Sequence, residues 1–130
     1  MRPAKFLLVD DDSATIELFA KILRLDGYEV HTALDADSAL RAVSDEEAPF
    51  DAVIMDLRMP TSDGLTLLRR ARGIESMRDV PVAIVTGDYF VSPETTAELR
   101  QLGARIRFKP LWADELLALA RTLIEVRPGR

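Results

Sequence analysis

The stretch AVIMD at residues 52–56 is a run of four apolar residues that ends in an aspartate. Three other short runs also end on polar residues: FLLV (6–9) before Asp10, Asp11 and Asp12, VAIV (82–85) before Thr86, and IRF (106–108) before Lys109 and Pro110. Continuous apolar runs such as AVIM and VAIV are typical of strands that are buried on both faces. If the four runs are parallel strands, their polar ends lie on one edge of one sheet. There they form a pocket of carboxylates, one hydroxyl and one ammonium.

Strand-like and helix-like patterns alternate along the whole chain. The predicted strands are 5–9, 28–33, 51–56, 80–86 and 105–108, and the predicted helices are 13–25, a segment capped by Asp35, 64–73, 93–102 and 113–125. Right-handed crossovers leave few arrangements for five successive βα units. We therefore predict an α/β fold with a doubly wound five-stranded parallel sheet in the order 2-1-3-4-5, flanked by five helices.

Local signals mark the ends of several helices. Asp12 is predicted to cap the first helix, and Asp26-Gly27 to end it. Pro93 suits the first turn of the fourth helix, which Gly103 ends. The apolar spacing predicts three inward faces: Ile16, Phe19, Ala20 and Leu23; Leu65, Leu68 and Ala71 or Arg72; and Leu116, Leu117, Ala120, Leu123 and Ile124.

The composition excludes several classes of protein. The chain has 130 residues, no cysteine, one histidine and a net charge of −5. Zinc–thiolate sites and cysteine nucleophiles are therefore excluded, and no basic stripe favours direct binding of nucleic acid. No apolar run is long enough for a signal sequence or a membrane span. We expect a cytoplasmic protein with no membrane contact, in which 1–126 form one domain and 127–130 a tail or truncated linker.

The carboxylates at the predicted sheet edge suggest a metal site. In a sheet of this order, ligands bind at the carboxyl ends of the strands where the winding direction reverses, which brings Asp10, Asp11 and Asp56 together. Three adjacent carboxylates ionise at low cost only if a cation joins them. Oxygen ligands without histidine or cysteine favour Mg²⁺, with Mn²⁺ as a possible substitute. The charges of the three carboxylates, a divalent cation and Lys109 would sum to zero.

The same edge suits phosphoryl transfer. A carboxylate held at a metal can attack an activated phosphoryl group. Lys109, Thr86 and the metal would then bind the oxygens of the transferring group. Each residue taken alone also fits an ordinary structural role, such as a turn carboxylate or a strand end. Their joint occurrence after four successive strands makes coincidence a poor explanation.

In these motifs the chain resembles the receiver domain of bacterial two-component response regulators, which has a flavodoxin-like fold. The resemblance runs from Lys5 to about Ile124 and rests on FLLVDDD, FDAVIMDLRMPTSDG, VPVAIVTG, the pair GA at 103–104, and FKP. It implies that Asp56 is the phosphoacceptor and that Asp10, Asp11 and the backbone carbonyl of Arg58 join it in binding Mg²⁺. It also implies that Thr86 is the switch hydroxyl, that Lys109 contacts the phosphoryl group, and that the Lys109-Pro110 peptide is cis.

Two features depart from the family pattern. Ile106 occupies the place on strand five where the family usually has a tyrosine or phenylalanine, so the usual coupling of Thr86 to an aromatic ring is in question. The chain instead has aromatic residues in the loop after Thr86 and before the last helix, namely Tyr89, Phe90 and Trp112. Exposed aromatic groups are common at interfaces. We therefore predict that the face formed by helix four, strand five and helix five binds a downstream partner or a second copy. Arg58 and Asp88 flank the site and are predicted to tune the loss of the phosphoryl group to water.

Several functions remain open from the sequence. The first is a receiver, not an enzyme in its own right, that accepts its phosphoryl group from a histidine kinase or phosphotransfer protein. It could act alone or belong to a longer protein. A degenerate receiver that serves only as a binding scaffold is an alternative, as is an aspartate-nucleophile phosphatase. The phosphatase is disfavoured because such enzymes have a second aspartate two residues after the nucleophile, where this chain has Arg58.

Overall fold

A computed structural model of the chain describes residues 2–45, 49–60 and 62–126. The strands are β1 (Lys5–Val9), β2 (Glu29–Ala33), β3 (Ala52–Met55), β4 (Val82–Thr86) and β5 (Ala104–Phe108). The helices are α1 (Ser13–Leu25), α2 (Ala36–Val43), α3 (Gly64–Arg72), α4 (Pro93–Gln101) and α5 (Ala113–Glu125), with one 3₁₀ turn at Glu75–Met77. The tail predicted at 127–130 lies outside the described residues.

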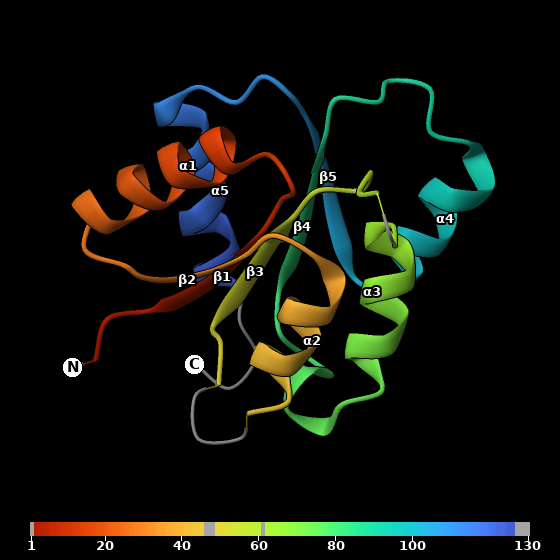
Figure 1. Cartoon of the computed structure of the whole chain (residues 1–130), viewed down its shortest axis with the longest axis horizontal. Helices are drawn as coiled ribbons and strands as arrows, with labels where there is room; N and C mark the ends of the chain where they lie inside the picture. Colours follow the sequence, from red (N-terminus) through yellow and green to blue (C-terminus); the bar gives the residue numbers. More distant parts are fainter. Residues whose placement is uncertain (1, 46–48, 61, 127–130) are drawn as a thin grey trace.

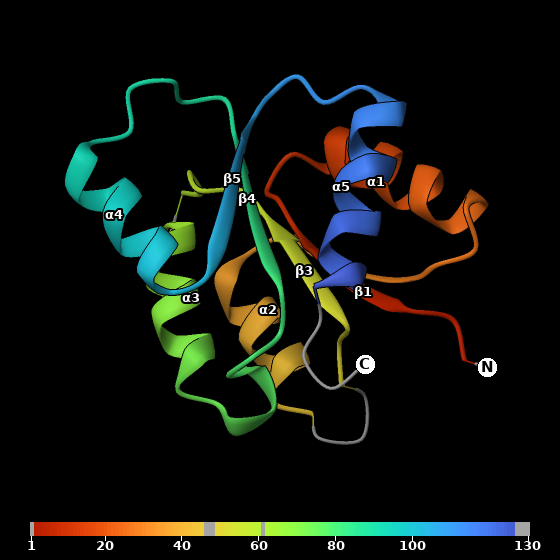
Figure 2. The same cartoon turned by 180° about the vertical axis from the view of Figure 1, so that it is seen from behind.

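All strand pairs are parallel, and the sheet has the order β2-β1-β3-β4-β5, which confirms the predicted topology. Figures 1 and 2 show a three-layer arrangement, with α1 and α5 on one face of the sheet and α2, α3 and α4 on the other. The edge strand β2 is the most exposed of the five. The central strands β3 and β4 are buried at every position because helices cover both of their faces.

Two apolar cores fill the spaces between the layers. One core joins the α1 and α5 residues to one face of the sheet, and the other joins α2, α3 and α4 to the opposite face. The predicted buried face of α1 is confirmed. In α5, Leu119 is buried and Leu117 is only partly buried, whereas the sequence pattern favoured Leu117. A small rotation of the helix about its axis moves such neighbours across the edge of the buried face.

The predicted helix ends are also confirmed. The side chains of Asp12 and Asp35 accept hydrogen bonds from backbone amides in the first turns of α1 and α2. Pro93 lies in the first turn of α4. Gly27 and Gly103 follow α1 and α4 with φ of 95° and 85°, a conformation that side chains other than glycine disfavour. The turns at Gly27 and Gly103 lead directly into the amino ends of β2 and β5.

Candidate functional site

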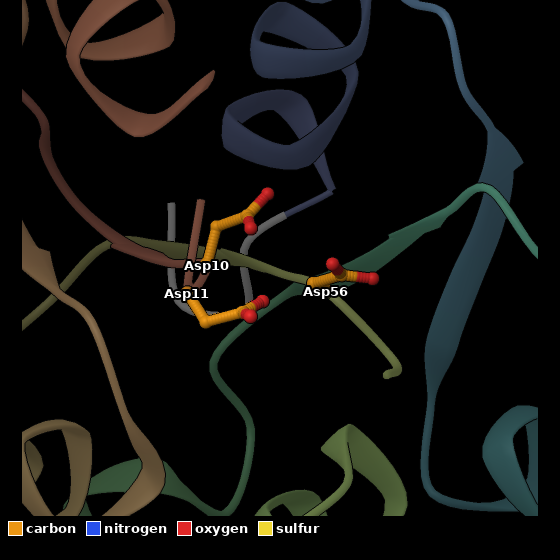
Figure 3. A group of neighbouring side chains, drawn as sticks. All are labelled: Asp10, Asp11 and Asp56. Atoms are coloured by element: carbon orange, nitrogen blue, oxygen red, sulfur yellow. The ribbon is translucent and has the colours of Figure 1, made fainter. Parts of the chain in front are cut away.

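The carboxyl edge of the sheet brings three aspartates together. Asp10 and Asp11 follow β1, and Asp56 follows the adjacent strand β3 (Figure 3). One carboxylate oxygen from each residue lies within 4.8 Å of the others. Asp10 and Asp56 are buried, whereas Asp11 is exposed. We refer to these three residues as the acidic cluster. The sequence predicted this cluster from strand order alone.

Backbone contacts fix the two buried aspartates. The Asp12 amide donates to Asp10 Oδ1 at 2.9 Å, and the Asp56 amide donates to the carbonyl of Val9 at 2.8 Å, which extends the β1–β3 pairing to the site. Gly64 begins α3 directly against Asp56, since a Cβ atom there would lie 2.6 Å from the Asp56 carbonyl oxygen. Only glycine fits this contact without a backbone shift.

Lys109 joins the acidic cluster from the end of β5. Its ammonium donates to Asp10 Oδ2 at 2.9 Å and to Asp56 Oδ2 at 3.2 Å. Burial lowers the pKa of Lys109. The hydrogen bond and charge of Asp10 and the contact with Asp56 raise it by a larger amount, so the net shift of the pKa is upward. Lys109 is therefore charged at neutral pH and offsets part of the negative charge of the site.

The pKa of Asp56 is also raised, which for a carboxyl disfavours the charged form. Burial raises the pKa of its carboxyl, and the charge of Asp10 adds to this effect. Lys109 and the Arg58 amide, which lies 3.3 Å from Asp56 Oδ1, act in the opposite direction without cancelling it. The ionised form of Asp56 is therefore less favourable here than in water. Additional positive charge at this edge would stabilise it.

Thr86 ends β4 beside the acidic cluster and has no exposed surface. Its hydroxyl oxygen accepts a hydrogen bond from the Asp88 amide at 3.0 Å. Its carbonyl accepts from the Lys109 amide at 2.9 Å, which ties the ends of β4 and β5 together. The predicted hydroxyl thus lies at the predicted edge and is linked to the loop that follows β4.

An ion pair connects the loops after β3 and β4. The guanidinium of Arg58 donates from Nε at 3.0 Å and from Nη2 at 2.8 Å to Asp88 Oδ2. The hydrogen bond from the Phe90 amide and the Arg58 contact lower the pKa of Asp88. The two residues that the sequence placed beside the site therefore contact each other across its rim.

The aromatic residues are arranged differently from the expected group of three. Tyr89 stacks on Phe108 of β5, with ring centres 5.3 Å apart, and its hydroxyl donates to the carbonyl of Lys109. Phe90 and Trp112 are 92% and 68% exposed, and the ring contacts among the described residues do not join them to Tyr89. The sequence analysis missed Phe108 as the partner of Tyr89, although its register opposite Thr86 places it beside the loop.

The donor set of the acidic cluster fits a hard divalent cation. All of its side-chain donors are carboxylate oxygens, and none of the metal-binding groups found among the described residues includes histidine. Magnesium and manganese prefer such ligands. The raised pKa of Asp56 is consistent with such a site, because burial, together with the charge of Asp10, disfavours the ionised carboxyl and a nearby cation would favour it.

A doubly wound sheet with this edge defines a class of α/β proteins whose site lies where the winding reverses. A family model described as "Response regulator receiver domain" matches residues 6–121. The chain belongs to this family, as its motifs indicated, and is the receiver domain of a two-component response regulator.

Curated relatives and solved structures agree with this assignment. The chain is 34% identical over 123 residues to the transcriptional regulatory protein PrrA of Mycobacterium tuberculosis, covering 95% of the chain and 51% of PrrA. The chain therefore spans about half the length of such relatives. Chemotaxis protein CheY4 of Vibrio cholerae is 30% identical with a TM-score of 0.84, covering 94% of this chain and 99% of that one. The receiver domain of NtrX from Brucella abortus is 34% identical with a TM-score of 0.80, covering 93% and 98%.

Among the described residues, no helix combines the length and the apolar character needed to cross a lipid bilayer.

Proposed function

We propose that this receiver domain, formed by residues 1–126, accepts a phosphoryl group on Asp56. The donor is a histidine kinase or phosphotransfer protein. The observation that carries the proposal is the position of the Lys109 ammonium, which lies within hydrogen-bonding distance of both Asp10 and Asp56. An ammonium in this place can bind the negatively charged oxygens of a phosphoryl group both as the group approaches Asp56 and after it is attached.

The residues of the chain have separate roles in this step. An Asp56 carboxylate oxygen forms the bond to phosphorus while the bond to the donor breaks. Lys109 binds one phosphoryl oxygen. The Thr86 hydroxyl turns away from the Asp88 amide and binds a second phosphoryl oxygen. The domain catalyses its own phosphorylation and dephosphorylation and has no separate substrate, so it is not an enzyme in the usual sense.

Asp10, Asp11, Asp56 and the backbone carbonyl of Arg58 would hold Mg²⁺, or Mn²⁺ in its place. Such an ion supplies positive charge that draws electrons from the phosphoryl oxygens. The chain contributes the carboxylates that hold the ion and the partly buried edge that limits the access of water. The ion pair between Arg58 and Asp88 narrows the path of water to Asp56 and slows the loss of the phosphoryl group.

The signal would leave through the face of α4, β5 and α5, in the cytoplasm. Tyr89, Phe90 and Trp112 lie in the loops beside this face and are exposed. A downstream partner or a second copy of the domain would cover them after phosphorylation. Exposed aromatic side chains of this kind contribute strongly to protein interfaces.

Phosphorylation with a small phosphodonor tests the proposal. The wild-type chain should take up one phosphoryl group in the presence of Mg²⁺ and none after chelation. Asp56→Asn should abolish uptake, and Asp37→Asn, which removes an exposed aspartate of α2, should leave it unchanged. Unchanged labelling of Asp56→Asn would show that another residue is the nucleophile.

The same measurement distinguishes the proposed phosphoryl-accepting receiver from a degenerate receiver that acts only as a binding scaffold. Ile106 in place of the usual aromatic residue is the observation that favours this second candidate. A scaffold would take up no phosphoryl group and would show no response to beryllofluoride, a mimic of the bound phosphoryl group.

A further inference from the structure

A second pocket lies at the amino ends of β4 and β5, at the opposite end of these strands from the acidic cluster. Its volume is about 410 Å³, within the range of small-molecule sites. The start of β4, the turn between α4 and β5, and the ends of α3 and α5 form its walls. Figure 2 shows α5 on one face of the sheet and α3 and α4 on the other, so the lining segments come from both faces.

Three arginines line this pocket, which we call the arginine pocket: Arg72, Arg78 and Arg105. The one acidic residue in its lining is Asp79. The pocket therefore carries net positive charge, although the whole chain has a net charge of −5. No ion pair among the described residues involves any of the three arginines. Their charge is available to a ligand.

Arg72 is held in place by backbone groups. Its Nε donates to the carbonyl of Leu102 at 2.8 Å, and its Nη1 donates to the carbonyls of Met77 and Val80 at 2.6 and 2.7 Å. Nη2 has no acceptor among the described residues. It lies 3.3 Å from where a Cβ of Gly103 would be, so the glycine leaves space beside it. A guanidinium that is fixed in this way presents its remaining N–H groups with little further loss of entropy.

Apolar residues make up most of the rest of the pocket lining, beside the polar side chain of Gln101. Pro81 and Val82 come from the start of β4, and Leu123 and Val126 from the end of α5. A site with an apolar wall and a few fixed charged groups suits a ligand with both kinds of surface. Burial lowers the pKa of Arg72 and the charge of Asp79 offsets this only in part, so an anion beside the guanidinium would further stabilise its charged form.

We propose that the arginine pocket binds a small organic anion in which an apolar ring or chain carries a carboxylate, phosphonate or phosphate group. The planar guanidinium groups match the oxygens of such a head group, and the apolar wall covers the body of the ligand. Binding does not depend on phosphorylation of Asp56, because the acidic cluster lies at the opposite edge of the sheet.

A titration of the ¹⁵N-labelled chain with phenylphosphonate, without Mg²⁺, tests this proposal by two-dimensional NMR. The amide signals of Leu102, Gly103 and Arg105 should shift saturably, and those of Asp56 and Asp88 should not. Benzyl alcohol has a similar body without the charge and should cause no saturable shift. Phenylphosphonate transfers no phosphoryl group, so a response cannot come from labelling of Asp56.

Two variants and a matched control identify the charges involved. Arg78→Gln and Arg105→Gln should each weaken phenylphosphonate binding about tenfold, the effect of losing one charge-assisted hydrogen bond. Arg107→Gln removes the same charge two residues along β5, outside the pocket, and should leave binding unchanged. Absence of saturable shifts, equal shifts with benzyl alcohol, or an equal loss in Arg107→Gln would each overturn the proposal.

Discussion

The Lys109 ammonium lies 3.2 Å from the Asp56 carboxylate, and yet the pKa of Asp56 is raised above its usual value. Burial and the neighbouring Asp10 charge outweigh the attraction of Lys109. The acidic cluster is therefore a place where the free domain ionises a carboxyl at some cost in free energy. Such a site gives up stability for function.

This relationship predicts the effect of neutralising Asp56 on stability. A carboxyl whose pKa is higher in the folded state stabilises the fold only while it is protonated, at low pH, and opposes folding once it ionises. Asp56→Asn should therefore raise the free energy of unfolding at pH 7 without Mg²⁺ by about 1 kcal/mol, a value reduced for screening by water. Urea unfolding of the wild-type chain and the variant measures this difference in the free energy of unfolding.

Magnesium provides the control for this prediction. Mg²⁺ should stabilise the wild-type chain and have a much smaller effect on Asp56→Asn, because the variant lacks one of the three carboxylates. Equal stabilisation of both proteins would mean that the ion binds elsewhere.

Gly64 predicts a different kind of destabilisation. Gly64→Ala would place a methyl group 2.6 Å from the Asp56 carbonyl oxygen, which is backbone and cannot move aside freely. We expect a loss of about 1–3 kcal/mol in urea unfolding, the usual cost of overpacking. Gly87→Ala is the matched control, since nothing lies within 4 Å of its added Cβ. A Gly64→Ala protein as stable as Gly87→Ala would contradict the close approach of α3 to the site.

The capping residue Asp35 predicts a dependence of stability on pH. The amide and hydroxyl of Ser38 lower the pKa of Asp35 below 3.8. A carboxyl with a lowered pKa stabilises the fold above its unfolded-state pKa, and this contribution is lost as the pH falls through its folded-state pKa. Asp35→Ala should therefore lower the melting temperature at pH 7 and do so less below pH 3.8. Asp37→Ala, two residues further along the chain in α2, is the matched control, and an equal change of both differences with pH would contradict the prediction.

The sequence was sufficient to place the five main residues of the site, because their positions depend only on the order of the strands. Asp10, Asp11, Asp56, Thr86 and Lys109 each follow an apolar run, and parallel pairing brings such positions to one edge. Side-chain conformation on the rim was less predictable. The sequence placed Arg58 and Asp88 near the site, but only the structure gives their ion pair.

Longer-range contacts of flexible side chains were beyond sequence reasoning. Arg72 was considered only as a possible member of the apolar face of α3, whereas it contacts three backbone carbonyls outside that helix. A long side chain can reach many acceptors, and helical periodicity does not choose among them. The pairing of Tyr89 with Phe108 could not be predicted from the sequence for a similar reason, because it depends on the path of the loop after β4.

That pairing predicts how the domain responds to phosphorylation without an aromatic residue at position 106. The Asp88 amide donates to the Thr86 hydroxyl, and Tyr89, the next residue, contacts both Phe108 and the Lys109 carbonyl. If the Thr86 hydroxyl turns to a phosphoryl oxygen, the Asp88 amide loses its acceptor and the Tyr89 contacts shift. Trp112, the one tryptophan of the chain, lies three residues after Lys109 and reports this change.

Beryllofluoride with Mg²⁺ should therefore change the fluorescence of Trp112 in the wild-type chain, and Tyr89→Leu should remove at least half of that change. Tyr89→Phe keeps the stacked ring and loses only the hydroxyl, so its response should lie between the two. Phe90→Leu is the matched control, because Phe90 is 92% exposed and has no ring contact among the described residues. If Phe90→Leu and Tyr89→Leu reduce the response equally, the loop transmits the signal without the Tyr89–Phe108 contact.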